Sequence, residues 1–334
     1  MHKFVPLFFS LALVSLLPVA SAHHGFASHY DPNTVIRIEG TVKQFDFINP
    51  HGFLYIDSVD EAGEAVVFRC DLMAKTQLIR RGADESLFPI GDSIVVEGFP
   101  ARREPNVCEF GTGYFADGSS FTMRSPESAK TQFAEIETPI VSADTDIPIL
   151  GTWIRASLYD GSGTRPTGMD SITEAGEAAV AEFDPIADDP VVHCKGASPV
   201  RNWGAPGLAT SIKQEGDTII IHHESMDVTR TVHMNLTEHP ADLPHSEMGH
   251  SIGRFEDDTL IIDTAAFDSG VIVRSALRTD QMTMVERLSV QPESGDLQIS
   301  WVVHEPVYYS EPITGGQLLK RTDQEFGAYE CNPE

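Results

Sequence analysis

Two adjacent histidines, His23 and His24, follow an apolar leader at the start of the chain and offer nitrogen ligands to a metal ion. The leader has a short basic start, an apolar run and the sequence Ala20-Ser21-Ala22, which is the small-residue pattern that signal peptidase accepts. We therefore predict that residues 1–22 are a signal peptide and that His23 becomes the N-terminal residue. An N-terminal histidine can bind one ion through its amine and its ring nitrogen together, and imidazole suits copper, zinc or nickel. The sequence predicts an exported protein, periplasmic or secreted, that can carry copper.

His51 is the third predicted metal ligand beside His23 and His24, because it follows Asn49-Pro50 at the rim between two predicted strands. His29 is a weaker additional candidate. The alternative is a histidine-rich surface segment whose hydrogen bonds are satisfied without a metal. An uncleaved membrane anchor is disfavoured, because the apolar run is shorter than the ~20 residues that span a bilayer and two prolines interrupt it. We expect no stable membrane insertion after cleavage.

A second group of histidines lies in the second half of the chain, together with an arginine and several carboxylates. Residues two apart on a strand share one face, so Arg230 and His233 point to opposite sides of a sheet. The alternation is too mixed to decide which of the two enters the interior. If Arg230 does, it needs a carboxylate partner. The candidates for that partner are Glu224, Asp263 and Glu286.

Three interpretations fit this second group of histidines, arginine and carboxylates. The leading hypothesis is a small-molecule ligand bound by Trp153, Arg230, His233, His250, Asp263 and Glu286. The alternative is a cofactor-free lyase, isomerase or hydratase that uses Glu224, Arg230, His233 and His250 for general acid and base catalysis. In the third interpretation these residues only brace the fold. The sequence names neither the ligand nor the oligomeric state.

Composition limits the partners and the redox compartment. The net charge of -27 becomes -28 when the leader removes Lys3, and a field of that sign repels phosphate backbones, so we expect no nucleic acid partner. Such a charge also keeps a protein soluble. Cysteines of an exported protein pair with one another, and two fall in each half of the chain. We therefore predict the disulfides Cys70–Cys108 and Cys194–Cys331.

Residues 23–125 are predicted to form a series of strands interrupted by one helix. This order of elements is typical of a small Greek-key barrel of the OB type. The helix is expected over residues 73–81, a β-bulge at Gly40, and a closing hairpin over residues 111–123. Residues 126–149 are predicted to be a linker, because they combine Ser, Pro, Thr and acidic residues without periodicity. The chain remaining after cleavage is long enough for two domains.

Residues 150–334 are predicted to form an antiparallel barrel of roughly eight to ten strands, of the calycin or lipocalin type, with room for a small ligand. Trp153 on its first strand and Arg321 on its last resemble the lipocalin closure, in which arginine stacks over tryptophan. A capping box of Ser171 and Glu174 predicts a helix over 174–183. The irregular stretch 184–207 is expected to act as a lid or plug. The predicted strands span 209–214, 218–224, 229–234, 251–255, 259–264, 283–291, 297–304 and 317–325.

Two groups of short motifs carry a resemblance to known families. The first resembles the opening of an uncharacterised family of exported bacterial proteins with a double-His start, and the second resembles an uncharacterised exported module of the lipocalin type. The resemblance implies export and a division into two domains, and it implies no reaction. The first group is His23-His24-Gly25-Phe26-Ala27, Asp31-Pro32-Asn33, Gly40-Thr41-Val42 and Asn49-Pro50-His51; the second is Met248 to Arg254, Asp263-Thr264, Glu286-Arg287 and Tyr329 to Asn332.

Overall fold

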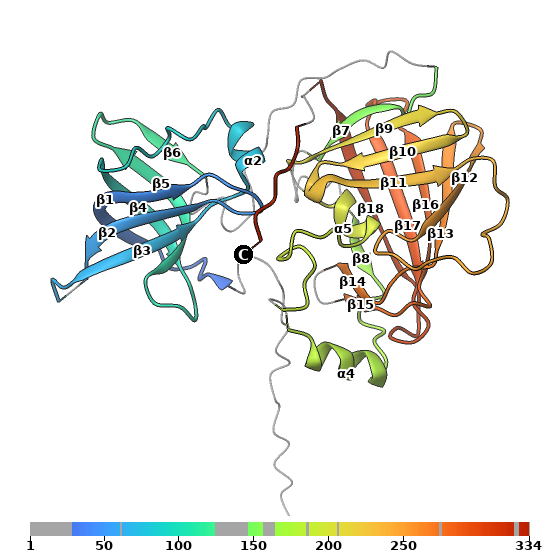
Figure 1. Cartoon of the computed structure of the whole chain (residues 1–334), viewed down its shortest axis with the longest axis horizontal. Helices are drawn as coiled ribbons and strands as arrows, with labels where there is room; N and C mark the ends of the chain where they lie inside the picture. The colour runs from blue at the N-terminus through green and yellow to red at the C-terminus, as the bar shows by residue number, and fades with distance from the viewer. Residues whose placement is uncertain are drawn as a thin grey trace, which may run out of the picture.

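The computed structural model describes residues 29–60, 62–123, 146–155, 164–184, 187–205, 207–273, 276–323 and 327–333. It contains two β-barrels that lie side by side, with the C-terminal segment 327–333 between them (Figure 1). The predicted signal peptide, His23, His24 and most of the predicted linker lie outside the described residues. Within the described part of the chain, no helix has the length and apolar character needed to cross a bilayer.

The first barrel is closed by a parallel pairing between its third and fifth strands. In the described residues its strands are β1 (Ile36–Asp46), β2 (Phe53–Val59), β3 (Ala65–Asp71), β4 (Ser93–Pro100), β5 (Val107–Phe115) and the short β6 (Ser120–Thr122), with helix α2 (Lys75–Ile79) between β3 and β4. The sheet order β3-β2-β1-β4-β5-β6, with β3 also paired to β5, is the OB arrangement that the sequence predicted.

Residue details of the first barrel differ from the prediction in two places. The register of β1 shifts between Val42 and Gln44, so the expected bulge at Gly40 is wrong. Gly40 is required for another reason: a Cβ there would lie 2.3 Å from the carbonyl oxygen of Asp57 on the neighbouring strand. The predicted hairpin over residues 111–123 is present as the pair of β5 and β6, but the barrel closes through β3 and β5. Cys70 and Cys108 face each other across the closing pair and form the predicted disulfide.

The interior of the first barrel is apolar. Phe88 lies at its centre, with the rings of Phe45, Phe110, Phe115 and Phe121 within 6.4 Å of its own ring centroid. The core cluster of described residues in this barrel contains no charged side chain. This domain is therefore held together by ordinary apolar burial and one disulfide.

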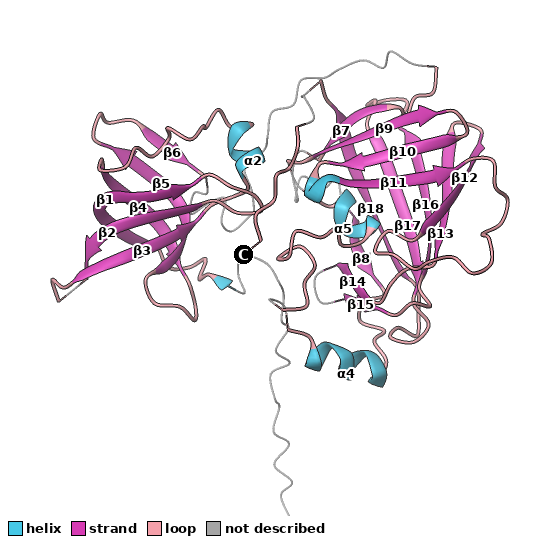
Figure 2. Ribbon diagram, in the orientation of Figure 1, coloured by secondary structure: helices cyan, strands magenta, loops and turns pink. Residues whose placement is uncertain are grey.

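The second barrel is a closed ring of nine strands in the described residues, within the predicted range. In ring order they are β7 (Gly151–Ile154), β9 (Ala209–Glu215), β10 (Thr218–His223), β11 (Val228–His233), β12 (His250–Glu256), β13 (Thr259–Ala265), β16 (Thr283–Val290), β17 (Leu297–His304) and β18 (Ile313–Arg321). Strand β8 (Thr164–Thr167) adds to β18 outside the ring, and β14 (Gly270–Val273) and β15 (Ala276–Arg278) form a separate hairpin. Figure 2 shows how strands dominate both halves of the molecule.

One pairing in this ring differs from the predicted antiparallel arrangement. Strands β11 and β12 run parallel, because the long loop 234–249 between them folds back and places Ser251 and Ile252, at the start of β12, beside Val232 and His233. The last strand is also displaced, since it spans residues 313–321 and not 317–325.

Helix α4 (Glu174–Glu182) forms where a helix was predicted, with a different cap. The side chain of Thr173, and not that of Ser171, accepts the backbone N–H of Gly176. The sequence pattern did not predict helix α5 (Pro199–Trp203) or the 3-10 turn η1 (Ser225–Asp227). It also did not predict the hairpin of β14 and β15.

Trp153 and Arg321 meet as predicted and close one end of the second barrel. The Arg321 guanidinium carbon lies 4.1 Å from the centroid of the Trp153 ring, and the indole Nε1 donates to the carbonyl of Ile149 at 2.9 Å. Arg321 also donates to the carbonyls of Leu150 and Pro148 through its two Nη atoms. The predicted disulfide Cys194–Cys331 ties the segment before α5 to the C-terminal segment.

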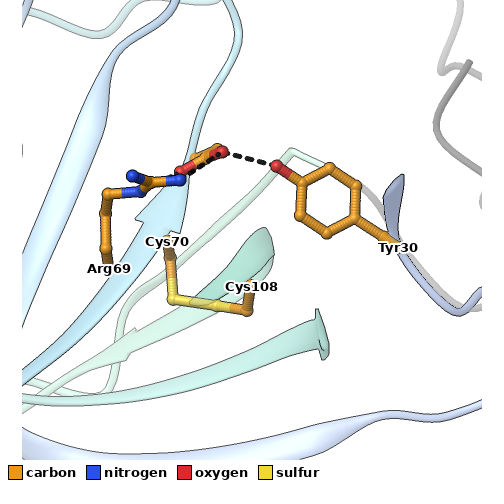
Figure 3. Close-up of a disulfide and its surroundings, with 5 residues drawn as sticks. Tyr30, Arg69, Cys70 and Cys108 are labelled. Carbon is orange, nitrogen blue, oxygen red and sulfur yellow. Dashed lines mark hydrogen bonds and ion pairs between the residues drawn. A yellow bond between two sulfur atoms is a disulfide. The ribbon is translucent and has the colours of Figure 1, made fainter. Parts of the chain in front are cut away.

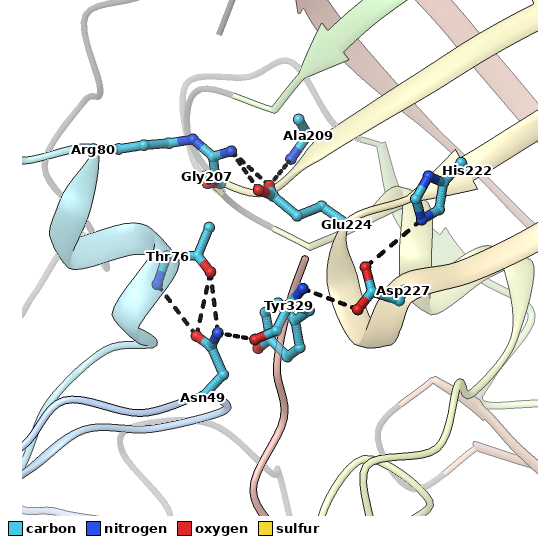
Figure 4. Close-up of polar contacts among 9 residues, drawn as sticks. All are labelled: Asn49, Thr76, Arg80, Gly207, Ala209, His222, Glu224, Asp227 and Tyr329. Carbon is cyan, nitrogen blue, oxygen red and sulfur yellow. Dashed lines mark hydrogen bonds and ion pairs between the residues drawn. The ribbon is translucent and has the colours of Figure 1, made fainter. Parts of the chain in front are cut away.

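The two barrels are joined by a buried ion pair (Figure 4). Arg80, the C-cap of α2, places Nη2 at 2.7 and 2.6 Å from the two carboxylate oxygens of Glu224, and its Nη1 donates to the carbonyl of Gly207 at 2.7 Å. Glu224 also accepts the backbone N–H of Ala209. Its side chain is 1% exposed, so this contact fixes the second barrel against α2.

The C-terminal segment makes a second connection between the barrels. Asn49 of the first barrel donates to the carbonyl of Tyr329, and the backbone N–H of Tyr329 donates to Asp227 of the second barrel at 2.9 Å. Lys75 forms an ion pair with Glu330 at 2.9 Å. The segment 329–331 therefore contacts both domains.

Candidate functional site

The faces of β11 decide where the predicted site residues lie. Val232 is part of the barrel core, and Arg230, two residues earlier, shares its face and is 2% exposed. His233 therefore points away from the interior. The same alternation places Ser251 and Thr264 inside, and His250 and Asp263 outside. The predicted ligand-binding set thus divides between the two faces of the barrel wall.

Arg230 and Glu286 form a buried ion pair in the barrel interior. Arg230 Nη1 donates to Glu286 Oε1 at 3.0 Å, and Nη2 contacts the other carboxylate oxygen. The remaining donors of the guanidinium reach the hydroxyls of Ser251 at 2.9 Å and Thr264 at 2.7 Å. Of the three carboxylates that the sequence offered, Glu286 is the partner. Because both charges are desolvated, the pair depends on these extra hydrogen bonds.

Helix α5 inserts a tryptophan beside this ion pair. The indole Nε1 of Trp203 donates to Glu286 Oε1 at 2.7 Å, and its ring lies 4.7 Å from the ring of His223 in an edge contact. The helix begins at Ser198, whose side chain accepts the backbone N–H of Arg201, with proline at the first helical position. Val200 and Trp203 belong to the barrel core. The segment that was expected to be a lid or plug therefore contributes two side chains to the interior.

Three buried side-chain atoms that face the interior of the second barrel have no hydrogen-bond partner among the described residues. They are His223 Nε2 on β10, Trp301 Nε1 on β17 and Gln317 Oε1 on β18. Trp301 and Gln317 face inward from neighbouring strands, and Gly315, opposite Trp301, leaves space for the indole. Gly204, which follows α5, lies near the Gln317 amide. Buried polar atoms without partners are uncommon in folded proteins, so three in one interior are notable.

His223 is a neutral imidazole in this interior. Burial, and next the positive charge of Arg230, lower its pKa to about 3. Its Nδ1 lies 2.9 Å from the hydroxyl of Thr210, which leaves Nε2 as the unpaired atom. The interior therefore combines one compensated ion pair with uncharged donors and acceptors.

The outer histidine cluster consists of His233, His239, His250 and Asp263. The rings of His233 and His250 stack with centroids 4.9 Å apart and an interplanar angle of 14°. His239, from the loop 234–249, places Nδ1 at 2.9 Å from His250 Nδ1 and Nε2 at 3.1 Å from Asp263 Oδ1. Partial burial lowers the pKa of His250, and the neighbouring His233 and His239 lower it further.

Glu224 belongs to neither of these groups, because it is bound to Arg80 at the contact between the barrels. The predicted catalytic set of Glu224, Arg230, His233 and His250 is thus spread over three places: the domain contact, the interior and the outer face.

The predicted N-terminal metal ligands are only partly described. His51 is exposed at the rim of the first barrel, and its charge lowers the pKa of the nearby Asp71 as a minor influence on that carboxyl group. Burial dominates and raises the pKa of Asp71, whose carboxylate accepts the hydroxyl of Tyr30 at 2.5 Å and binds Arg69 at 2.9 Å (Figure 3). The described residues contain no group of three or more His, Cys, Asp or Glu side chains placed to hold a metal.

Comparison with protein families gives one match. Residues 12–107 match the model of a family of unknown function (DUF6152). No curated protein matches the chain.

Three solved structures are similar to the chain at low sequence identity. A point mutant of the fluorescent protein UnaG is 11% identical, with a TM-score of 0.24, over 53% of this chain and 98% of that one. A heat-soluble SAHS protein from Ramazzottius varieornatus is 13% identical, with a TM-score of 0.23, over 54% of this chain and 100% of that one. A luciferase domain from the dinoflagellate Lingulodinium polyedrum is 12% identical, with a TM-score of 0.20, over 59% and 47% of the two chains.

Sequence reasoning missed several residues of the interior. The order Ile219, Ile221, His223 on one strand face was a usable signal for a buried histidine, because its two companions are strongly apolar. The pair Ser198-Pro199 was a usable signal for the start of α5. Nothing in the sequence pattern indicated that Trp203 would enter the barrel. The residues missed are Trp203, Thr210, His223, Ser251, Thr264, Trp301 and Gln317 inside, and His239 outside.

Proposed function

We propose that this protein is exported and binds one small, flat, uncharged molecule inside the second barrel, next to α5. The observation that carries the proposal is the set of unpaired buried atoms on His223, Trp301 and Gln317. An unpaired buried polar atom costs about 1–3 kcal/mol of stability. A ligand that pairs these atoms would recover that free energy on binding.

The unpaired atoms also specify the chemistry of the ligand. Trp301 Nε1 can only donate, so it needs an acceptor, and Gln317 Oε1 can only accept, so it needs a donor. The charges of Arg230 and Glu286 already compensate each other. A ligand with a net charge would enter without a counter-ion, so a neutral amide or nitrogen heterocycle fits better than a carboxylic acid.

Helix α5 would control access to this site. Trp203 fills the interior beside Glu286, so a ligand has to displace its ring or lie against it. The helix is held by side-chain contacts that can separate without unfolding a strand. Ser198 donates to the carbonyl of Ile272, Arg201 pairs with Asp189 at 2.8 Å, and Arg155 donates to the carbonyl of Gly204 at 2.9 Å.

Calorimetric titration with nicotinamide tests the proposal, with benzoate as a probe of similar size that carries a negative charge. We expect one nicotinamide per chain and at least tenfold weaker binding of benzoate. Gln317→Met keeps the side-chain volume and removes the unpaired carbonyl, so it should abolish nicotinamide binding without lowering stability. Binding of benzoate as tight as that of nicotinamide, or nicotinamide binding that survives in Gln317→Met, would contradict the proposed site.

The second candidate is a cofactor-free lyase, isomerase or hydratase. The observation that favours it is the hydrogen-bonded chain from Asp263 through His239 to His250, which orients a neutral imidazole at a half-exposed position. Glu224 and Arg230 are engaged in separate ion pairs, so His250 and His233 would carry the proton transfer. His250→Ala should then abolish turnover while leaving nicotinamide binding intact, and unchanged turnover would remove this candidate.

We also propose export and a copper site at the new N-terminus, made by His23 and His24 with His51. Two disulfides favour an oxidising compartment. The hydroxyl of Tyr30 is bound to Asp71, which interacts with His51, and the seven residues from His23 to Tyr30 can extend ~24 Å, far enough to return to that rim.

N-terminal sequencing and elemental analysis test this metal site. The mature protein should begin at His23 and hold copper at that end, and a version with His23, His24 and His51 replaced by alanine should lose that ion. Equal copper content in the two versions would contradict an N-terminal site.

A further inference from the structure

The outer histidine cluster has the hydrogen-bond pattern that proteins use to orient metal ligands. Metal-binding imidazoles usually donate the N–H of one ring nitrogen to a carboxylate, which leaves the other nitrogen free to ligate. His239 makes this contact with Asp263 through Nε2, at 3.1 Å. Because Asp263 can only accept, His239 carries its proton on Nε2 and an unprotonated Nδ1.

The unprotonated nitrogen of His239 points at a second imidazole. His239 Nδ1 and His250 Nδ1 lie 2.9 Å apart, so His250 donates its proton across this short separation. Two imidazole nitrogens bound to one ion at about 2.0–2.1 Å each would be separated by about 3.3 Å at a tetrahedral angle. A shift of a few tenths of an ångström in the loop 234–249 would produce that spacing.

The exposure of the cluster also suits a cation. The stacked ring of His233 fixes the plane of the His250 ring. The side chains of His239 and Asp263 are 21% and 45% exposed, so an ion can reach them from solvent. The strongly negative chain raises the local concentration of cations.

We propose that His239 and His250 bind one late first-row transition ion on the outer face of β12 and β13, with Asp263 as the carboxylate that orients His239. The ion replaces the proton between the two Nδ1 atoms, and that proton moves through solvent to Nε2 of His250, so no proton is released near pH 7. Since the described residues offer no group of three protein ligands, water completes the coordination. Copper(II) is preferred over zinc(II), as the usual affinity order dictates.

Copper(II) titration of the variant with His23, His24 and His51 all replaced by alanine tests this proposal, because the N-terminal ligand set is then removed. We expect one equivalent of copper(II) and an electron paramagnetic resonance spectrum with two nitrogen ligands. His239→Ala and His250→Ala should each lose that equivalent. His304→Ala, at the exposed end of β17, is the matched control and should keep it.

Asp263→Asn sharpens the test, since loss of an orienting carboxylate weakens metal binding about 10- to 100-fold without removing a ligand. Thermal unfolding of each variant establishes that it is folded. Absence of copper(II) binding in the variant that lacks His23, His24 and His51, or binding that persists in both further histidine variants, would overturn the proposal. Nicotinamide binding in the interior is measured on the same samples, so failure of the metal site and failure of the barrel site are distinguishable.

Discussion

The two barrels have opposite interiors. The first is filled by phenylalanine rings around Phe88 and by aliphatic side chains, and its core cluster of described residues contains no charged side chain. The second contains the ion pair of Arg230 and Glu286, the neutral His223, and polar atoms without partners. Apolar packing is sufficient to stabilise a closed barrel, as the first shows. The polar interior of the second therefore needs a reason other than stability, and the ligand binding proposed above would supply one.

The largest expected effect on stability comes from removing one of the two buried charges inside the second barrel. Arg230→Met leaves Glu286 buried and unpaired, which should lower the free energy of unfolding of the second barrel by about 3–5 kcal/mol. Chemical denaturation followed by tryptophan fluorescence measures this loss. All three tryptophans of the chain, Trp153, Trp203 and Trp301, lie in the second barrel.

The matched control removes both charges together. Arg230→Met combined with Glu286→Leu eliminates the uncompensated charge, so the double variant should regain most of the lost stability. If the double variant is as unstable as the single one, the ion pair is essential to packing. The interior of the second barrel would then differ less from that of the first than proposed.

The second prediction concerns pH. His223 has a pKa of about 3 in the folded protein, below the value of about 6.5 in an unfolded chain, so the unfolded state binds more protons between these limits. Stability should therefore fall as pH falls below about 6.5, by about 1.4 kcal/mol per pH unit from this residue.

The measurement is the difference in unfolding free energy between the parent protein and His223→Gln, from pH 7 to 4.5. Taking the difference cancels the acidic groups common to both proteins. A constant difference across this range would show that His223 is protonated in the folded state.

A smaller effect is expected from replacing one interior hydroxyl. Thr264→Val keeps the volume and removes the acceptor of Arg230 Nη2, so it should cost about 1–3 kcal/mol. In the first barrel, the volume-conserving change Ile56→Leu should cost less than about 1.5 kcal/mol. Denaturant midpoints of the two variants compare polar with apolar interiors directly. Equal losses would indicate that shape, and not hydrogen bonding, governs both.

Sequence patterns predicted the parts of this protein that local periodicity controls. The strands of both barrels, the stacking of Arg321 on Trp153 and the two disulfides follow from alternation, spacing and compartment. The sequence did not predict which face of β11 points into the barrel, because its two faces mix Thr, His, Arg and Val. Trp203 enters the barrel through tertiary packing of an irregular segment rich in Pro and Gly. His239 reaches His250 only because the loop 234–249 folds back, which makes β11 and β12 parallel.

The comparison of Trp301→Phe with Trp153→Phe tests the central claim most directly. Both indoles are buried and lose similar volume in this change, but Trp153 Nε1 is bound to Ile149 and Trp301 Nε1 has no partner among the described residues. The account predicts that Trp301→Phe is more stable than Trp153→Phe by about 1–3 kcal/mol, and that it loses nicotinamide binding. Equal destabilisation of the two variants, with binding retained in Trp301→Phe, would contradict it and make the polar interior a structural feature.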